Sequence, residues 1–78
     1  MNKDNLVKMA NQIGQFFDAW PDREAARKEV ANHLKKFWDP RMRKALIAHV
    51  EASGAEGSGL IPLVVEALGL LAGEKQPG

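Results

Sequence analysis

The chain has 78 residues, no cysteine and a formal net charge of +1, a size that corresponds to one small domain. Without cysteine it forms neither a disulfide nor a thiolate metal site, and its two histidines alone cannot complete a structural zinc site. Its best apolar segment, residues 60–72, is far shorter than the roughly 20 residues of a transmembrane helix and contains Pro62 and Glu66. We therefore expect a soluble cytoplasmic protein that does not enter a membrane.

The first half of the chain is predicted to form two amphipathic helices. In residues 4–20, large apolar side chains recur along one side of a helix, and the pair Trp20-Pro21 ends it. Asp22 can cap a second helix over residues 22–38, with an acidic residue in its first turn. We expect the apolar stripe of this second helix to consist of Ala26, Val30, His33, Leu34 and Phe37, with Trp38 at its edge.

The second half is predicted to form two more helices. Asp39 as the N-cap and Pro40 at the first helical position predict a helix over residues 40–52. Glycine and serine then make residues 53–59 a flexible linker, residues 60–72 form the fourth helix, and residues 74–78 are a disordered tail. The sequence thus predicts an all-α fold, a small bundle of four short helices in a single domain over residues 1–78.

Two features of these helices are unusual. The fourth helix is apolar over an arc of about 220°, more than three short helices are expected to cover. This favours contact with a partner over the alternative, in which the fourth helix is tucked between two others with one row of leucines modestly exposed. Gly14 lies inside the first helix, where glycine costs about 1 kcal/mol relative to alanine, so it indicates either close backbone approach or mere tolerance.

Residues 35–44 place two aromatic side chains between two basic clusters. Phe37 is interpreted as a core residue because it is in register with the apolar stripe of its helix. Trp38 either seals the turn between the second and third helices or anchors a partner, and Trp and Arg are enriched at binding hot spots. Arg41 and Arg43 are interpreted as partner-binding, since their planar groups can pair with carboxylates, although they could simply solvate the third helix.

No catalytic, cofactor-binding or metal-binding site is predicted. His33 and His49 lie on different helices near apolar stripes, without a carboxylate at ligand spacing or an adjacent nucleophile. We expect both to be partly buried structural histidines. The acidic residues are scattered over caps and polar faces, where no cleft would perturb their pKa values for acid–base chemistry.

Much of the chain resembles the delta subunit of NAD-dependent formate dehydrogenase. The resemblance runs from about residue 6 to residue 50, resumes in the apolar segment 60–71, and is weakest in the glycine-rich linker. The residues that carry it are found in six groups: 6–14, 16–17, 21–22, 31–34, 37–43 and His49.

This resemblance implies an accessory subunit of a soluble formate:NAD+ oxidoreductase. In such enzymes the large alpha subunit holds molybdenum or tungsten on bis-molybdopterin guanine dinucleotide, together with iron–sulfur clusters. The beta and gamma subunits pass electrons through further clusters and FMN to NAD. The delta subunit is implied to bind none of these cofactors, to dock on the alpha subunit, and to support assembly, maturation or stability.

The residues expected to contact the large subunit are Trp38, Arg41, Arg43, Leu63 and Leu70. Two other functions stay open at this point. A small helical nucleic-acid binder would use the basic residues of the 35–44 segment, although a net charge of about +4 over residues 1–50 is weak for that role. A self-associating module would instead bury the leucines of the fourth helix in a homo-oligomer, at least when the chain is isolated.

Overall fold

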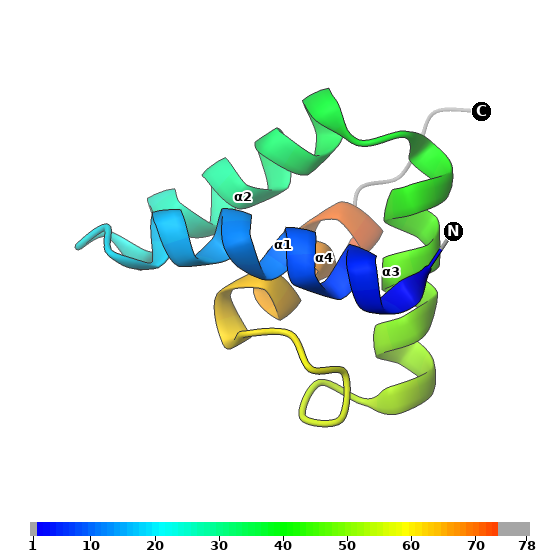
Figure 1. Cartoon of the computed structure of the whole chain (residues 1–78). Coiled ribbons are helices and arrows are strands. Elements are labelled where there is room, and N and C mark those ends of the chain that lie inside the picture. The colour runs from blue at the N-terminus through cyan, green and yellow to red at the C-terminus, as the bar shows by residue number, and fades with distance from the viewer. Residues whose placement is uncertain (1, 74–78) are drawn as a thin grey trace.

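The computed structural model describes residues 2–73, which form four α-helices and no strand (Figure 1). The helices are α1 (Lys3–Asp18), α2 (Arg23–Phe37), α3 (Pro40–Ser53) and α4 (Pro62–Gly73). The all-α prediction is confirmed, and each helix boundary lies within about two residues of its predicted place. The predicted tail, residues 74–78, lies outside the described residues. No helix within residues 2–73 is both long enough and apolar enough to cross a bilayer.

Side-chain caps determine where the first three helices begin. The Oδ1 atom of Asn2 accepts a hydrogen bond of 2.9 Å from the backbone N–H of Asp4 at the start of α1. Asp22 accepts one of 3.1 Å from Ala25 at the start of α2, and Asp39 accepts one of 2.8 Å from the N–H of the second residue of α3. Each cap satisfies an N–H group that has no partner within its own helix.

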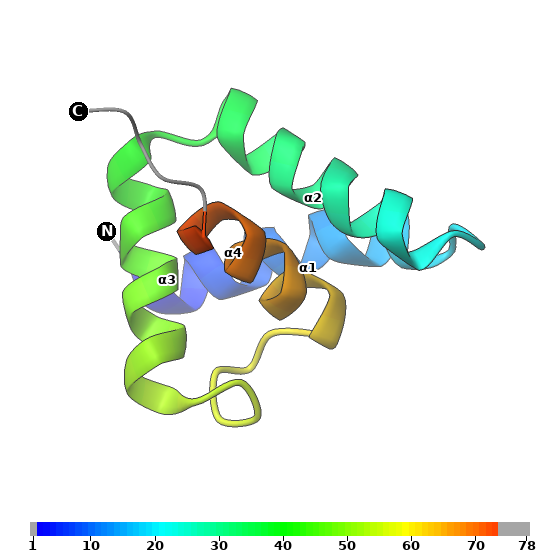
Figure 2. The same ribbon diagram turned by 180° about the vertical axis from the view of Figure 1, so that it is seen from behind.

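The helices α1 and α2 meet at a tight turn and diverge along their lengths, with α3 running across their open ends (Figure 1). The view from behind shows α4 lying between α2, α3 and α1 (Figure 2). All four helices contribute to one core, whose largest fully buried side chains are Val30, Leu34, Leu46, Leu63 and Val64. The fourth helix therefore occupies the centre of the domain.

This central position corrects the prediction that α4 presents a broad apolar surface to a partner. Leu63 is completely buried, so it cannot be a partner-binding residue, whereas Leu70 stays 38% exposed. The helix α4 has only 12 residues and packs along α2 with α1 and α3 on other sides, which buries Leu63, Val64, Ala67 and Leu68 but leaves part of its last turns exposed. The alternative of a fourth helix tucked between the others is confirmed.

The segment between α3 and α4, expected to be a flexible linker, is hydrogen-bonded to two helices. Asn11 of α1 donates from Nδ2 to the carbonyl of Gly59 and accepts at Oδ1 from the N–H of Ile61, both at 2.9 Å. His49 of α3 lies with Nε2 2.9 Å from the carbonyl oxygen of the buried Ser58. His33 and His49 are both partly buried, as predicted.

Gly14 lies where α1 meets the start of α4. A Cβ atom at this position would lie 2.8 Å from Cδ1 of Ile61 and closer still to Cγ2 of Val64. Contacts this short are essentially absent between real side chains. Of the two interpretations of Gly14, close approach is therefore the one that the structure supports.

Candidate interaction surface

At the turn between α2 and α3, the exposure of the two aromatic residues is the reverse of the one predicted. Phe37 is 71% exposed, while Trp38 is only 6% exposed and belongs to the core. Both the assignment of Phe37 to the core and that of Trp38 to a partner contact are therefore wrong. The other interpretation of Trp38, a side chain that seals the turn, is correct.

The backbone explains this reversal. Helix α2 ends at Phe37, and Trp38 adopts an extended conformation (φ −93°, ψ 140°) that directs its indole into the core instead of continuing the helical path. At this end α2 has diverged from α1, so α1 does not cover Phe37 (Figure 1). The neighbouring ring is that of His33, with the two ring centroids 4.8 Å apart.

Large apolar side chains are exposed on neighbouring sides of α1 and α2. We call this set the apolar face, and it consists of the exposed Met9, Phe16, Trp20 and Phe37 together with the half-buried Ile13. Phe16 is 70% exposed, and Met9 and Trp20 are each 41% exposed. The three α1 members follow the helical repeat, so they lie along one side of the helix, and Trp20 follows just past its end. Phe17 joins Phe16 to Trp20, with ring centroids 5.0 and 5.2 Å away in edge-to-face geometry.

A groove of about 450 Å³ connects the two helices within this face. Trp38 and Met42 bring the α2–α3 turn and α3 into it, and its lining residues are Met9, Gln12, Ile13, His33, Phe37, Trp38 and Met42. None of these residues is Lys, Arg, Asp or Glu. The groove is thus an apolar hollow with only an amide and an imidazole as polar groups.

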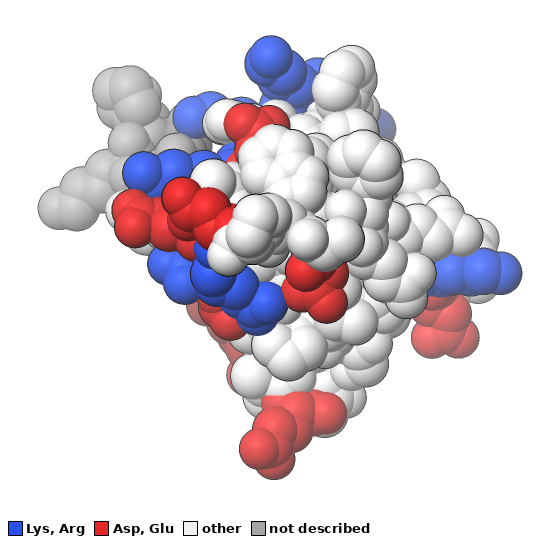
Figure 3. Space-filling model, turned by 90° about the vertical axis from the view of Figure 1, so that its left-hand side faces the viewer, with Lys and Arg blue, Asp and Glu red and all other residues white. Residues whose placement is uncertain are grey.

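The end of the molecule where α1 passes into α2 carries charged residues, among them Asp18 and Arg23, beside an uncharged area (Figure 3). Figure 3 views this end, and uncharged residues fill much of its centre and right side, whereas charged residues gather at the left and around the rim. An uncharged apolar surface next to charged groups is typical of a protein–protein contact rather than of phosphate binding.

The two arginines of the turn occupy different environments. The Nη1 atom of Arg43 donates to three carbonyl groups at the end of α2, at 2.6 Å to Trp38, 3.2 Å to Lys35 and 3.3 Å to Leu34. It therefore adds a donor to carbonyl groups at the end of α2, where the carbonyl of Leu34 also accepts from the backbone N–H of Trp38. The side chain of Arg41 is 83% exposed, and its Nε lies 3.6 Å from Asp39.

Asp39 is adapted to its capping role. The hydrogen bond from the backbone N–H of Arg41 is the main reason why the pKa of its carboxyl is below the usual value, and the charges of Arg41 and Arg43 act in the same direction. Arg43 thus contacts the backbone of Trp38, whereas Arg41 extends into solvent beside Asp39. Leu63 and Leu70 lie on α4 and do not line the apolar groove.

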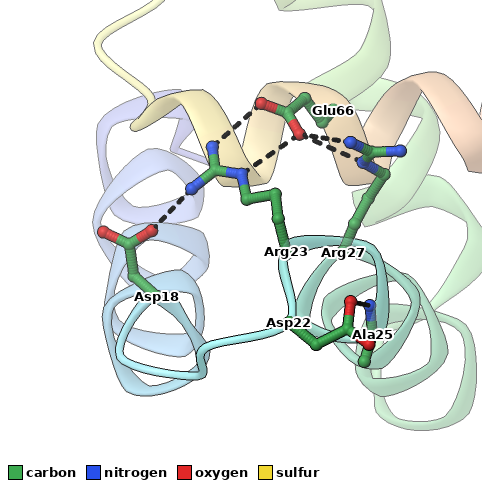
Figure 4. Close-up of polar contacts among 6 residues, drawn as sticks. All are labelled: Asp18, Asp22, Arg23, Ala25, Arg27 and Glu66. Atoms are coloured by element: carbon green, nitrogen blue, oxygen red, sulfur yellow. Dashed lines mark hydrogen bonds and ion pairs between the residues drawn. The ribbon is translucent and has the colours of Figure 1, made fainter.

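A cluster of ion pairs holds α4 against the start of α2 (Figure 4). Glu66 lies 2.9 Å from Nη2 of Arg23 and 3.0 Å from Nη2 of Arg27, and Arg23 also pairs with Asp18 at 3.0 Å. The hydrogen bond from Arg23 is the largest cause of the lowered pKa of Glu66, and the same contact raises the pKa of Arg23. In the sequence, Glu66 was only an interruption of an apolar helix, and that isolated charge was the available signal.

Metal-ligating side chains do not cluster in this structure. Between residues 2 and 73, no group of three or more His, Asp or Glu side chains could hold a metal ion. The apolar face is therefore the feature from which a functional site can be built.

Comparison with known proteins identifies the family. Residues 5–68 match the family described as NADH-dependent formate dehydrogenase delta subunit FdsD. No curated protein and no solved structure matched the chain. The family match spans well over half of the 78 residues and agrees with the resemblance seen in the sequence. The chain belongs to the family of NADH-dependent formate dehydrogenase delta subunits.

Proposed function

We propose that this protein is a non-catalytic accessory subunit of a soluble, cytoplasmic NAD-dependent formate dehydrogenase. In this proposal it docks on the large alpha subunit, within a complex that also contains beta and gamma subunits, and supports assembly, maturation or stability. Family membership supports the delta-subunit assignment. The exposed apolar face is the observation that carries the docking role.

The physical argument concerns side chains that the fold leaves in water. Phe16 and Phe37 are each about 70% exposed, and full burial of one such side chain stabilises a protein by about 1.5–3 kcal/mol. Single exposed apolar residues are ordinary, but Phe37 lines one groove together with Met9, and Phe16 and Trp20 continue the exposed apolar side of Met9 along α1 and just past its end. Aromatic residues in such a position are well suited to act as the central anchors of an interface.

The proposal assigns the redox chemistry of the complex to the other subunits. Iron–sulfur clusters are held chiefly by cysteine thiolates, and this chain has no cysteine. The molybdenum or tungsten on bis-molybdopterin guanine dinucleotide, the iron–sulfur clusters and the FMN would thus be carried by the alpha, beta and gamma subunits. This chain would affect how much active complex exists and how long it lasts.

A co-purification experiment tests the docking surface. The subunits are expressed together with an affinity tag on the alpha subunit, and this chain carries Phe16→Ser, Phe37→Ser or both. Each side chain is mostly exposed, so we expect little change in the stability of the isolated chain. We expect the double variant to reduce the recovered delta subunit at least tenfold, because about 1.4 kcal/mol of lost binding gives that factor.

Lys28→Ser is the matched control. Lys28 lies nine residues before Phe37 in α2, about 180° around the helix, and makes only an exposed ion pair with Glu24. This variant should co-purify like the natural sequence. If the double phenylalanine variant is folded and still recovered in wild-type amounts, the apolar face is not the docking surface.

The supporting role requires a separate measurement. The complex is prepared with and without this chain, and formate oxidation is followed per alpha subunit during storage at 30 °C. We expect the preparation without this chain to contain less assembled complex or to lose activity faster. Equal yield and equal half-life would contradict an accessory role in assembly or stability.

The same apolar face could also bring two copies of the isolated chain together. We propose this only for the chain without its partner, because exposed apolar surface that is normally covered by a larger subunit promotes self-association. Light scattering of the isolated chain would show a mass above 8.6 kDa that the double phenylalanine variant returns to the monomer value.

A further inference from the structure

A second hollow lies on the other side of the α2–α3 turn. It has a volume of about 410 Å³ and is formed by the end of α2, the first two turns of α3 and the end of α4. Its lining residues are Lys35, Pro40, Arg43, Lys44, Ile47, Leu71 and Ala72. The apolar groove described above shares none of these residues. The two hollows are therefore separate sites.

The lining of this pocket divides into a basic part and an apolar part. Three of its seven residues carry a positive charge, and none is acidic. The remaining four, among them Ile47 and Leu71, have apolar side chains. A ligand that fits both parts has a negative group next to an aliphatic group.

Arg43 is held in place in this pocket by the fold. Its three hydrogen bonds to carbonyl groups at the end of α2 all come from Nη1. Within residues 2–73, its Nε and Nη2 atoms make no hydrogen bond, so this edge of the guanidinium retains its donors. A fixed planar edge with two parallel donors matches the two oxygens of a carboxylate.

Lys44 adds a second cation with few constraints. Its side chain is exposed and, within the described part of the chain, forms no ion pair. Asp39, whose carboxyl feels the charge of Arg43, is already engaged as the N-cap of α3. Among the described residues that line the pocket, every charged side chain is therefore positive.

We propose that this pocket binds an acidic segment of a partner protein, with a side-chain carboxylate on Arg43 and Lys44 and a neighbouring aliphatic side chain against Ile47 and Leu71. A protein segment suits the site better than a nucleic acid for two reasons. No aromatic residue lines the pocket for base stacking, and three cations are few for a phosphate backbone. The proposal is independent of whether the apolar face docks on the large subunit.

A titration of the full 78-residue chain, followed by 1H–15N NMR, tests this proposal. The probe is the peptide acetyl-Glu-Leu-Glu-Leu-amide, which carries carboxylates next to aliphatic side chains. We expect saturable shifts confined to the amides of residues 43–47 and 71–72. The peptides acetyl-Gln-Leu-Gln-Leu-amide and acetyl-Glu-Ser-Glu-Ser-amide should each bind at least about threefold more weakly, because each lacks one of the two contacts.

Lys44→Gln is the variant of choice, because Arg43 also holds the end of α2 and its removal could unfold the chain. Lys44→Gln should weaken binding of the acidic peptide about threefold, whereas Lys8→Gln, on α1 and outside the pocket, should not change it. Inorganic phosphate and a ten-nucleotide single-stranded DNA serve as competing anions, and we expect neither to displace the peptide at equal concentration.

Several results would overturn the proposal. These are equal affinity for the glutamine peptide, shifts located away from the pocket, an unchanged affinity of Lys44→Gln, and displacement of the peptide by the DNA at equal concentration. The last result would instead assign the pocket to a nucleic acid.

Discussion

Replacing Gly14 by alanine sets two opposite effects against each other. In the interior of α1, alanine is a better helix former than glycine by about 0.8–1 kcal/mol. Against this, the new methyl group would lie 2.8 Å from Cδ1 of Ile61 and even closer to Cγ2 of Val64. The sign of the change in unfolding free energy depends on whether these neighbours can move.

The structure indicates that they cannot move without a cost. Val64 is fully buried in α4, and its β-branched side chain has one strongly preferred rotamer in a helix. Forcing an additional methyl group into such a contact costs about 1–3 kcal/mol. After subtraction of the gain in helix propensity, we expect Gly14→Ala to destabilise the fold by about 1 kcal/mol. For a chain of this length that corresponds to a melting temperature about 4–8 °C lower.

Gly69→Ala is the matched control, since it makes the same chemical change in α4 where no atom lies within 4 Å of the new Cβ. It should stabilise the chain by up to about 1 kcal/mol. Circular dichroism at 222 nm during thermal and urea unfolding measures both variants. If Gly14→Ala stabilises the chain as much as Gly69→Ala does, then α1 does not pack closely on α4, and the argument fails.

Two further changes test the contacts that hold α4 and the segment before it. Asn11→Ala removes both hydrogen bonds to Gly59 and Ile61 and should destabilise the fold by about 1–2 kcal/mol in urea unfolding, whereas a negligible change would show that water replaces them. Glu66→Gln tests how the stability of the fold depends on pH. The pKa of Glu66 is lower in the folded chain than its usual 4.5, so the ionised carboxylate stabilises the fold above about pH 4.5. This contribution is lost as the pH falls through the folded pKa. Melting temperatures should therefore differ between Glu66→Gln and the natural chain at pH 7 and converge once the pH has fallen below the folded pKa. A difference that stays constant with pH would contradict the assigned contact with Arg23.

The helices could be predicted from the sequence because their limits depend on local chemistry. Asp22 and Asp39 accept hydrogen bonds from the first turns of α2 and α3, and Pro40 takes the first helical position, where its missing N–H costs nothing. These interactions involve residues within three positions of one another. No tertiary contact is needed to recognise them.

The exposure of individual side chains could not be predicted in the same way. Phe37 is in register with Val30 and Leu34, yet it is exposed because α1 and α2 diverge before the end of α2. Trp38 is buried because one residue leaves the helical path. The angle between two helices and the direction of a turn depend on packing among distant segments. They therefore cannot be predicted from the apolar periodicity of a single helix. The partner-binding residues predicted around the α2–α3 turn therefore stay a prediction, and there the exposure of the two aromatic residues is the reverse of the one expected.

The isolated domain leaves exposed several aromatic side chains whose burial would stabilise it. A single core in a chain of this size provides only about 3–5 kcal/mol of net stability, and burial of one phenylalanine is worth about 1.5–3 kcal/mol. Phe16 and Phe37 together could therefore change the stability of this domain by as much as its whole net value, yet both remain about 70% exposed. A partner that covers them binds the folded chain selectively and so stabilises it by mass action. If the proposed docking on the large subunit is correct, the chain is therefore most stable when it is bound there.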